Sequence, residues 1–268
     1  MKVEFCSLSS GSSGNSYYLG NDTEGILIDA GISARSINTF MKDIGLSIDR
    51  IMGILITHNH GDHIRGLLTL TRKYRIPVYT SETVWKSIFD EPSYRKINTD
   101  CIRRIQVQSA FQLAGFDIES FPVSHDTPET LGYHIRAGKR KITIVTDLGH
   151  ICNTAAGYIK AADFLVIESN YDEQMLMNGM YPAFLKKRIV SDHGHLDNQH
   201  TSSFLAENMS EELSHICLAH LSKNNNTPEK ALETIHRTFT EKGKPIDGKP
   251  QILVLNRHAP SEVFCLEK

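Results

Sequence analysis

The hexapeptide His58-Asn59-His60-Gly61-Asp62-His63 constrains this chain more than any other feature of the sequence. It holds four side chains that can bind a metal ion, and it directly follows the apolar run 51–56, which is typical of a buried strand. A tetrahedral zinc ion takes four ligands at about 2.0–2.2 Å for nitrogen and oxygen. Residues so close in sequence rarely meet that geometry alone. We therefore expect two metal ions that share these side chains and take further ligands from elsewhere.

Three more strand-like segments each end on a residue type that binds metals. Residues 115–125 end on His125, residues 141–147 on Asp147, and residues 215–220 on His220. In open α/β sheets, ligands bind beyond the carboxyl ends of the strands, because those ends lie along one edge. These residues are therefore expected to converge with the hexapeptide.

Strand-like and helix-like segments interleave along the 268 residues, and this periodicity alone predicts a mixed α/β fold. A chain of this length can bury a large core, and no linker or repeat divides it, so one domain is expected over residues 1–268. Ser81 and Thr227 are expected to cap helices. Asp62 is expected in the first turn of a helix that continues through Leu68.

Composition limits the partners and the cellular location that we expect for the protein. The net charge of -2 gives no general attraction to nucleic acid, so any such attraction must be local. There is no apolar run long enough to cross a bilayer and no secretory signal, so no membrane contact is expected. The five cysteines are odd in number and form no Cys-x-x-Cys pair, which is typical of reduced thiols in a cytoplasmic protein.

The order of the metal-binding motifs resembles the metallo-β-lactamase superfamily. The segment Ile26-Leu27-Ile28-Asp29-Ala30-Gly31 matches the first motif of that family, and the hexapeptide, His125, Asp147 and His220 follow in the family's order. The resemblance implies an α/β (α+β) fold built as a four-layer αββα sandwich.

The resemblance also implies a ligand set for two divalent ions. The ligands would be His58, His60 and His125 for one ion, Asp62, His63 and His220 for the other, and Asp147 as the bridge between them. Imidazole and carboxylate without thiolate suit zinc or manganese. Water held between two such ions loses a proton near neutral pH, so a bridging hydroxide is the expected nucleophile. Asp62 counts among the catalytic residues in this scheme.

A purely structural metal site, or histidines in a polar loop, is the alternative interpretation of these motifs. A structural zinc site is usually closed by four ligands, which are often cysteines. Seven ligand-type residues exceed that need, so we expect a catalytic centre.

Four further segments resemble the YycJ/WalJ-like branch of the superfamily, which is related to tRNase Z and to PhnP-like phosphodiesterases. These segments are residues 9–16, 168–171, 194–198 and 219–225. This closer resemblance implies a nuclease, with DNA exonuclease as the most specific expectation.

His195 and Glu168 are catalytic residues by the same resemblance. His195 would stabilise or protonate the leaving alkoxide, and Glu168 would hold the His195 ring. The alternative is a surface histidine in a polar turn. Leu196 and Asp197 follow His195 where tRNase Z has a Ser-Thr pair, which argues against a tRNA substrate.

The loop 9–16 is rich in glycine and serine, so its N–H groups and hydroxyls are able to face an anion. A flexible connecting turn is the alternative. The expected substrate contacts are Ser12, Ser13, Asn15 and, near the last metal motif, Lys223.

The leading functional hypothesis is therefore a dinuclear metal-dependent phosphodiesterase or nuclease that acts on nucleic acid or another phosphodiester. The alternative is a small-molecule hydrolase acting on a thioester, lactone or amide, because the same metal site serves carbonyl groups. A redox module is disfavoured, because diiron relatives usually carry Glu where this chain has His60, together with a fused flavin domain. DNA or RNA preference, polarity, the native metal and the oligomeric state stay open.

Overall fold

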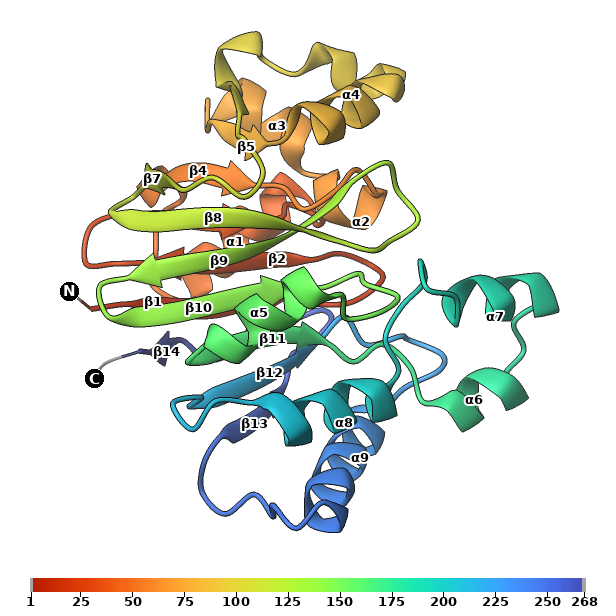
Figure 1. The fold of residues 1–268 in the computed structure, drawn as a ribbon. Coiled ribbons are helices and arrows are strands. Elements are labelled where there is room, and N and C mark those ends of the chain that lie inside the picture. The colour runs from red at the N-terminus through yellow and green to blue at the C-terminus, as the bar shows by residue number, and fades with distance from the viewer. Residues whose placement is uncertain (1, 267–268) are drawn as a thin grey trace.

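Two seven-stranded sheets pack against each other in the computed structural model, which describes residues 2–266 (Figure 1). Met1, Glu267 and Lys268, which belong to the expected domain 1–268, lie outside the described residues. The first sheet consists, in spatial order, of β14 (Phe264–Cys265), β1 (Glu4–Ser9), β2 (Ser16–Gly20), β3 (Gly25–Ile28), β4 (Ile51–Leu55), β5 (Val78–Thr80) and β6 (Ile102–Arg104).

The second sheet has a similar plan. In spatial order it consists of β13 (Gln251–Val254), β12 (His215–Ala219), β11 (Phe164–Glu168), β10 (Arg140–Val145), β9 (Thr130–Ala137), β8 (Phe116–Val123) and β7 (Phe111–Leu113). In chain order, each sheet is antiparallel in its first part and parallel from β3 or β10 onward, except that the last strand, β14, pairs antiparallel with β1. The expected metal-binding residues follow the carboxyl ends of strands in both sheets.

Helices form the two outer layers. Those of the first half are α1 (Ala34–Asp43), α2 (Gly61–Ile64), α3 (Leu67–Lys73) and α4 (Glu82–Asp90), with short 3-10 helices at Ile48–Arg50, Pro92–Lys96 and Thr99–Cys101. Those of the second half are α5 (Asn153–Ala161), α6 (Glu173–Asn178), α7 (Ala183–Ile189), α8 (Asn198–Asn208) and α9 (Pro228–Glu241). Helices α5, α8 and α9 cover the second sheet, whereas α6 and α7 project from the body (Figure 1). The predicted αββα sandwich is confirmed.

Aromatic side chains hold the two sheets together. Phe5 of β1 and Phe164 of β11 are buried, and their ring centroids are 4.9 Å apart. The ring centroid of Phe264 in β14 lies 6.2 Å from that of Phe164, so Phe264 adds to the same contact between the sheets. Burying such rings removes about 150–250 Å² each from water, so this layer dominates the packing energy.

Local sequence signals account for most helix ends. The Ser81 hydroxyl accepts a hydrogen bond from the Val84 N–H at 3.1 Å, and the Thr227 hydroxyl accepts one from the Lys230 N–H at 3.2 Å. Both predicted caps are therefore confirmed.

The predicted helix from Asp62 through Leu68 is wrong in its continuity, because α2 ends at Ile64 and α3 begins at Leu67. Gly66 explains the break. Its N–H donates to the Ala30 carbonyl at 2.8 Å, and a Cβ added there would lie 2.7 Å from the Ile32 carbonyl oxygen. The chain presses against the segment after β3 at this point and changes direction.

None of the helices within residues 2–266 combines the length and the apolar character needed to cross a bilayer. All five cysteines are unpaired.

Truncating the inter-sheet contact should destabilise the protein far more than truncating an exposed ring. We expect Phe164→Ala to lower the free energy of unfolding by about 3–5 kcal/mol, because it leaves a cavity between the sheets. Phe184→Ala is the matched control, since that ring is 75% exposed, and should cost less than about 0.5 kcal/mol. Urea denaturation measures both, and equal losses would contradict this account of the core.

Candidate metal centre

The seven expected metal ligands converge at one edge of the two sheets. They form overlapping groups in which the ligand atoms lie within 4.8 Å of one another. These groups are His58, His60 and His125; Asp62, His63 and His220; His58, His63 and Asp147; and Asp147, Glu168, His195 and His220. The first two groups match the two expected ligand sets, and Asp147 belongs to both groups that remain.

Asp147 lies between the two ligand sets. Its Oδ2 is 3.3 Å from His63 Nε2, and its Oδ1 is 3.9 Å from His125 Nε2. Asp62 contributes a second carboxylate, with Oδ2 at 3.7 Å from His63 Nε2 and 3.5 Å from His220 Nε2. The position of Asp147 between the two ligand sets suits a carboxylate that is shared by two cations.

Several inward-facing atoms of the cluster are buried but form no hydrogen bond within residues 2–266. They are His58 Nε2, His125 Nε2, His220 Nε2 and Asp147 Oδ2. A buried polar atom that forms no hydrogen bond is costly and calls for an explanation. A divalent cation coordinated by these atoms supplies one, so the residues fit a metal centre.

Hydrogen bonds at the opposite ring nitrogen fix the orientation of four imidazoles. His58 Nδ1 lies 2.9 Å from the Thr57 hydroxyl, and His63 Nδ1 lies 2.7 Å from Asp29 Oδ2. His125 Nδ1 lies 3.0 Å from the Gly194 carbonyl oxygen, and His220 Nδ1 lies 2.9 Å from Glu168 Oε1. Metal-binding histidines typically donate their second N–H in this way, which leaves Nε2 free for the metal.

Asp29 holds the ligands of both sets in place. Its fully buried carboxylate accepts hydrogen bonds from the Thr57 N–H at 2.9 Å and from the Thr57 hydroxyl. Because the same hydroxyl also contacts His58, Asp29 connects His58 and His63 through Thr57. The sequence pointed to Asp29 as a family motif but gave it no role.

Three residues at the site have a left-handed backbone although they carry side chains. Asp29, Asp147 and His220 follow β3, β10 and β12 and have φ angles of 61°, 59° and 54°. This conformation costs roughly 1–2 kcal/mol for a residue with a Cβ. It turns each strand sharply at its end, and such strain is typical of functional sites.

The charges of the cluster favour a cation. Burial opposes ionisation of His63, but the carboxylates of Asp147, Asp29 and Asp62 outweigh it and raise the pKa of His63 to about 9. By contrast, burial and neighbouring imidazoles lower the pKa of His58 well below its usual value, which favours the neutral imidazole that metal binding requires. A divalent cation would balance the same negative charge that attracts a proton to His63.

His195 and Glu168, the two residues expected to assist catalysis, lie beside the cluster. Glu168 is fully buried, and its Oε1 lies 2.8 Å from His195 Nδ1 and 2.9 Å from His220 Nδ1. Its Oε2 accepts from the N–H groups of Leu148 and Leu196, each at 3.1 Å. Burial opposes ionisation of Glu168, but both imidazoles outweigh it and hold its pKa below the usual value. One carboxylate therefore orients His220, an expected metal ligand, and His195 together.

The residues expected to contact substrate are placed differently from one another. Ser12 lines a cavity of about 170 Å³ that also contains His195. Asn15 is fully buried, where it accepts from the Gly11 N–H at 2.9 Å, and its amide nitrogen lies 3.0 Å from His63 Nε2. This placement favours a positioning role for Asn15. Ser13 and Lys223 are exposed and do not line the cavity.

Two residues that face the centre were not among the expected site residues. Asp126 Oδ1 lies 3.2 Å from His125 Nε2 and 3.5 Å from His60 Nε2. Its other carboxylate oxygen bonds to the guanidinium of Arg188 on α7, which lines the same cavity. Asp126 directly follows a metal motif and Arg188 ends a basic run, but only the fold brings them together.

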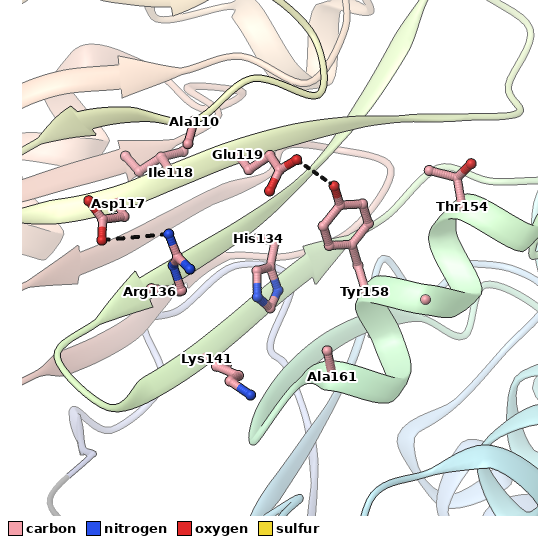
Figure 2. A pocket seen from close by; sticks show the side chains of 11 residues that line it. Ala110, Asp117, Ile118, Glu119, His134, Arg136, Lys141, Thr154, Tyr158 and Ala161 are labelled. Carbon is pink, nitrogen blue, oxygen red and sulfur yellow. Dashed lines mark hydrogen bonds and ion pairs between the residues drawn. The ribbon is translucent and has the colours of Figure 1, made fainter.

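A larger cavity of about 340 Å³ lies elsewhere, between α5 and the outer face of β8, β9 and β10 (Figure 2). Its polar groups are largely paired with one another. The Tyr158 hydroxyl donates a hydrogen bond to Glu119 Oε1 at 2.8 Å, and Arg136 Nη2 lies 3.8 Å from Asp117 Oδ2. None of the expected metal ligands lines this cavity, so it is separate from the metal centre.

Comparison with known proteins agrees with this geometry. The family model described as a β-lactamase superfamily domain matches residues 24–220, and the chain belongs to this superfamily. The chain is 40% identical to a protein named exodeoxyribonuclease YycJ from Bacillus anthracis, over 91% of each chain. It is 35% identical to exodeoxyribonuclease WalJ from Streptococcus pneumoniae serotype 2, over 85% of each chain.

Solved structures support the same fold. The metallo-β-lactamase fold protein YhfI from Bacillus subtilis superposes with a TM-score of 0.73 at 13% identity, over 99% of this chain and 100% of that chain. The family and the ligand cluster together support binding of divalent metal ions.

Weakening the support of His63 should weaken metal binding without removing a ligand. We expect Asp29→Asn to lower metal affinity about 10–100-fold, because the ring loses its charged partner. Competition with a chromogenic chelator measures this change. Asp22→Asn is the control, since Asp22 is exposed and distant in the sequence from every ligand. An affinity equal to that of the control would show that Asp29 does not position the ligand.

Proposed function

We propose that this protein is a dinuclear metal-dependent phosphodiesterase that shortens DNA strands from an end. The proposal assigns His58, His60 and His125 to one ion, Asp62, His63 and His220 to the other, and Asp147 to both. Zinc and manganese both suit this imidazole and carboxylate set. The proposed substrate is nucleic acid, and the proposed location is the cytoplasm.

The pairing of His195 with Glu168 is the observation that carries this proposal. His195 is part of the Asp147 group but is partly exposed, with 20% of its side chain accessible, and it lines the cavity beside the cluster. With Nδ1 bonded to Glu168, its free Nε2 is available to a substrate. His195 is not among the seven assigned metal ligands, so it is available as a proton donor. Such a donor suits a reaction whose leaving group is an alkoxide, because an alkoxide leaves poorly unless it is protonated.

The positions of these groups assign each of them a role in the proposed reaction. Two bound cations would polarise a phosphoryl oxygen and lower the pKa of an attacking water. Arg188, at the same cavity, is placed to attract the phosphate. As the bond from phosphorus to the leaving oxygen breaks, its electron pair stays on that oxygen, and His195 donates its Nε2 proton there. Glu168 holds the ring through Nδ1 during this transfer, and Nε2 afterwards regains a proton from water.

Two relatives named as exodeoxyribonucleases support DNA as the substrate and cleavage from an end. The alternative, hydrolysis of a thioester, lactone or amide, uses the same metal chemistry. It is less favoured because it gives no role to Arg188, which lines the cavity.

Removing the proposed proton donor should stop turnover while leaving the metal ions in place. We expect His195→Ala to retain the wild-type metal content and to lose about 10²–10⁴-fold in kcat on a DNA strand. Metal content is measured by mass spectrometry of the dialysed protein. The matched control is His236→Ala on α9, where the ring is exposed. Unchanged turnover in His195→Ala would remove this residue from the mechanism.

The topology of the substrate separates cleavage from an end from internal cleavage. We expect a linear single strand to release mononucleotides from the start of the reaction and a closed circular strand of the same sequence to stay intact. Electrophoresis of end-labelled and circular substrates with Mn²⁺ or Zn²⁺ measures this difference. Cleavage of the circle would identify an endonuclease. Hydrolysis of a thioester or lactone with no cleavage of DNA or RNA would favour the alternative function.

A further inference from the structure

Exposed hydrophobic side chains gather on one projecting segment of the molecule. We call residues 173–190, which contain α6 and α7, the α6–α7 arm (Figure 1). The large hydrophobic residues that are exposed within residues 2–266 are Met52, Met177, Met180, Phe184 and Val190, and four of these five belong to the arm. Met180 is 100% exposed. A concentration of exposed hydrophobic side chains marks an interaction surface, whereas single exposed hydrophobic residues scattered over a protein are normal.

The arm is attached directly beside the metal centre. Arg188 pairs with Asp126, which lies next to the ligands His60 and His125. The His195 N–H donates to the Ile189 carbonyl at 2.9 Å, so the end of the arm leads into the segment that carries the proposed proton donor. Tyr181, Leu185 and Arg188 line the same cavity as Ser12 and His195. A molecule lying along the arm therefore reaches the reacting site.

The arm is also positively charged, although the whole chain is not. It contains Lys186, Lys187 and Arg188 and the single acidic residue Glu173, which gives a net charge of +2 (3 minus 1), against -2 for the chain. Lys187 is exposed. An apolar and aromatic surface next to cations is the composition that binds single-stranded nucleic acid, where bases stack on side chains and phosphates meet the cations.

We propose that the α6–α7 arm binds the unpaired nucleotides at the end of a DNA strand and directs that end into the cavity beside His195. This inference rests on the proposed function and adds the form of the substrate and the residues that select it. Several unpaired bases are expected along the arm, because every base pair of a duplex except the terminal one is already covered on both faces and leaves no face for Phe184. A second copy of the chain fits less well, since a two-fold contact would bring two cationic arms together.

The substitution Phe184→Trp reports stacking directly. The only native tryptophan, Trp85, is 1% exposed, so the emission of the introduced, exposed indole would dominate any response to an added strand. We expect the emission of Phe184→Trp to be quenched when a phosphorothioate dT12, which resists cleavage, is added. Wild type should show no comparable change. An emission of Phe184→Trp that is unchanged at saturating dT12 would contradict stacking at this position.

Affinity measurements test the same contact without a new fluorophore. We expect Phe184→Ala to bind dT12 about tenfold more weakly than wild type, with little change for a blunt duplex. Lys187→Gln should lower the dependence of the affinity on salt by about 0.7 in the log–log slope. Met52→Ala is the matched control, because Met52 is exposed but lies on β4 outside the arm. Fluorescence anisotropy of labelled strands measures all three variants.

Each outcome separates this inference from the proposed function. A loss of kcat/KM in Phe184→Ala that is at least about tenfold greater on single-stranded DNA than on bis-p-nitrophenyl phosphate supports the arm's role. Equal dT12 affinities of Phe184→Ala and Met52→Ala, with a wild type that degrades DNA, overturn the arm's role alone. A dimer that Phe184→Ala dissociates, with dT12 affinity unchanged, also overturns it in favour of self-association. A wild type that neither binds nor cleaves DNA overturns the proposed function as well.

Discussion

Hydrogen bonds from the ring Nδ1 atoms to buried acceptors decide where the imidazoles of this protein point. Asp29, Thr57, Gly194 and Glu168 provide these acceptors, and each fixes one ring so that its Nε2 faces a common space. The acceptors come from distant parts of the chain, so the site exists only when both sheets are assembled. Glu168 has the additional task of linking a ligand, His220, to His195. In the proposed mechanism, metal binding by His220 and proton donation by His195 would therefore depend on the same buried carboxylate.

The residues that follow three of the strands at the site have a strained backbone. Three strands are followed by a residue other than glycine with a left-handed backbone, and each such residue costs about 1–2 kcal/mol. The aromatic layer between the sheets, centred on Phe5 and Phe164, supplies the packing that tolerates this strain. A rigid interior supporting a strained edge is consistent with a site whose ligand positions are set before any metal binds.

Sequence patterns were sufficient for the parts of the structure that depend on local signals. Alternation and apolar runs located the strands that precede His125, Asp147 and His220, and side-chain caps located helix starts such as Ser81. The break at Gly66 was not predictable, because it arises from contact with the segment after β3, which is distant in the chain. Asp126 was missed for a similar reason. Its partner Arg188 is 62 residues distant, and only the fold brings the pair to the metal centre.

The resemblance to a known family supplied the assignment of ligands to two ions, and the geometry of the cluster is compatible with that assignment. Anomalous diffraction from crystals of the metal-loaded wild-type protein measures the number and the position of the ions directly. We expect two peaks about 3.5–4 Å apart, one on each side of Asp147, within the two ligand sets. A single peak, or peaks at sites that do not involve Asp147, would contradict a dinuclear centre in this protein.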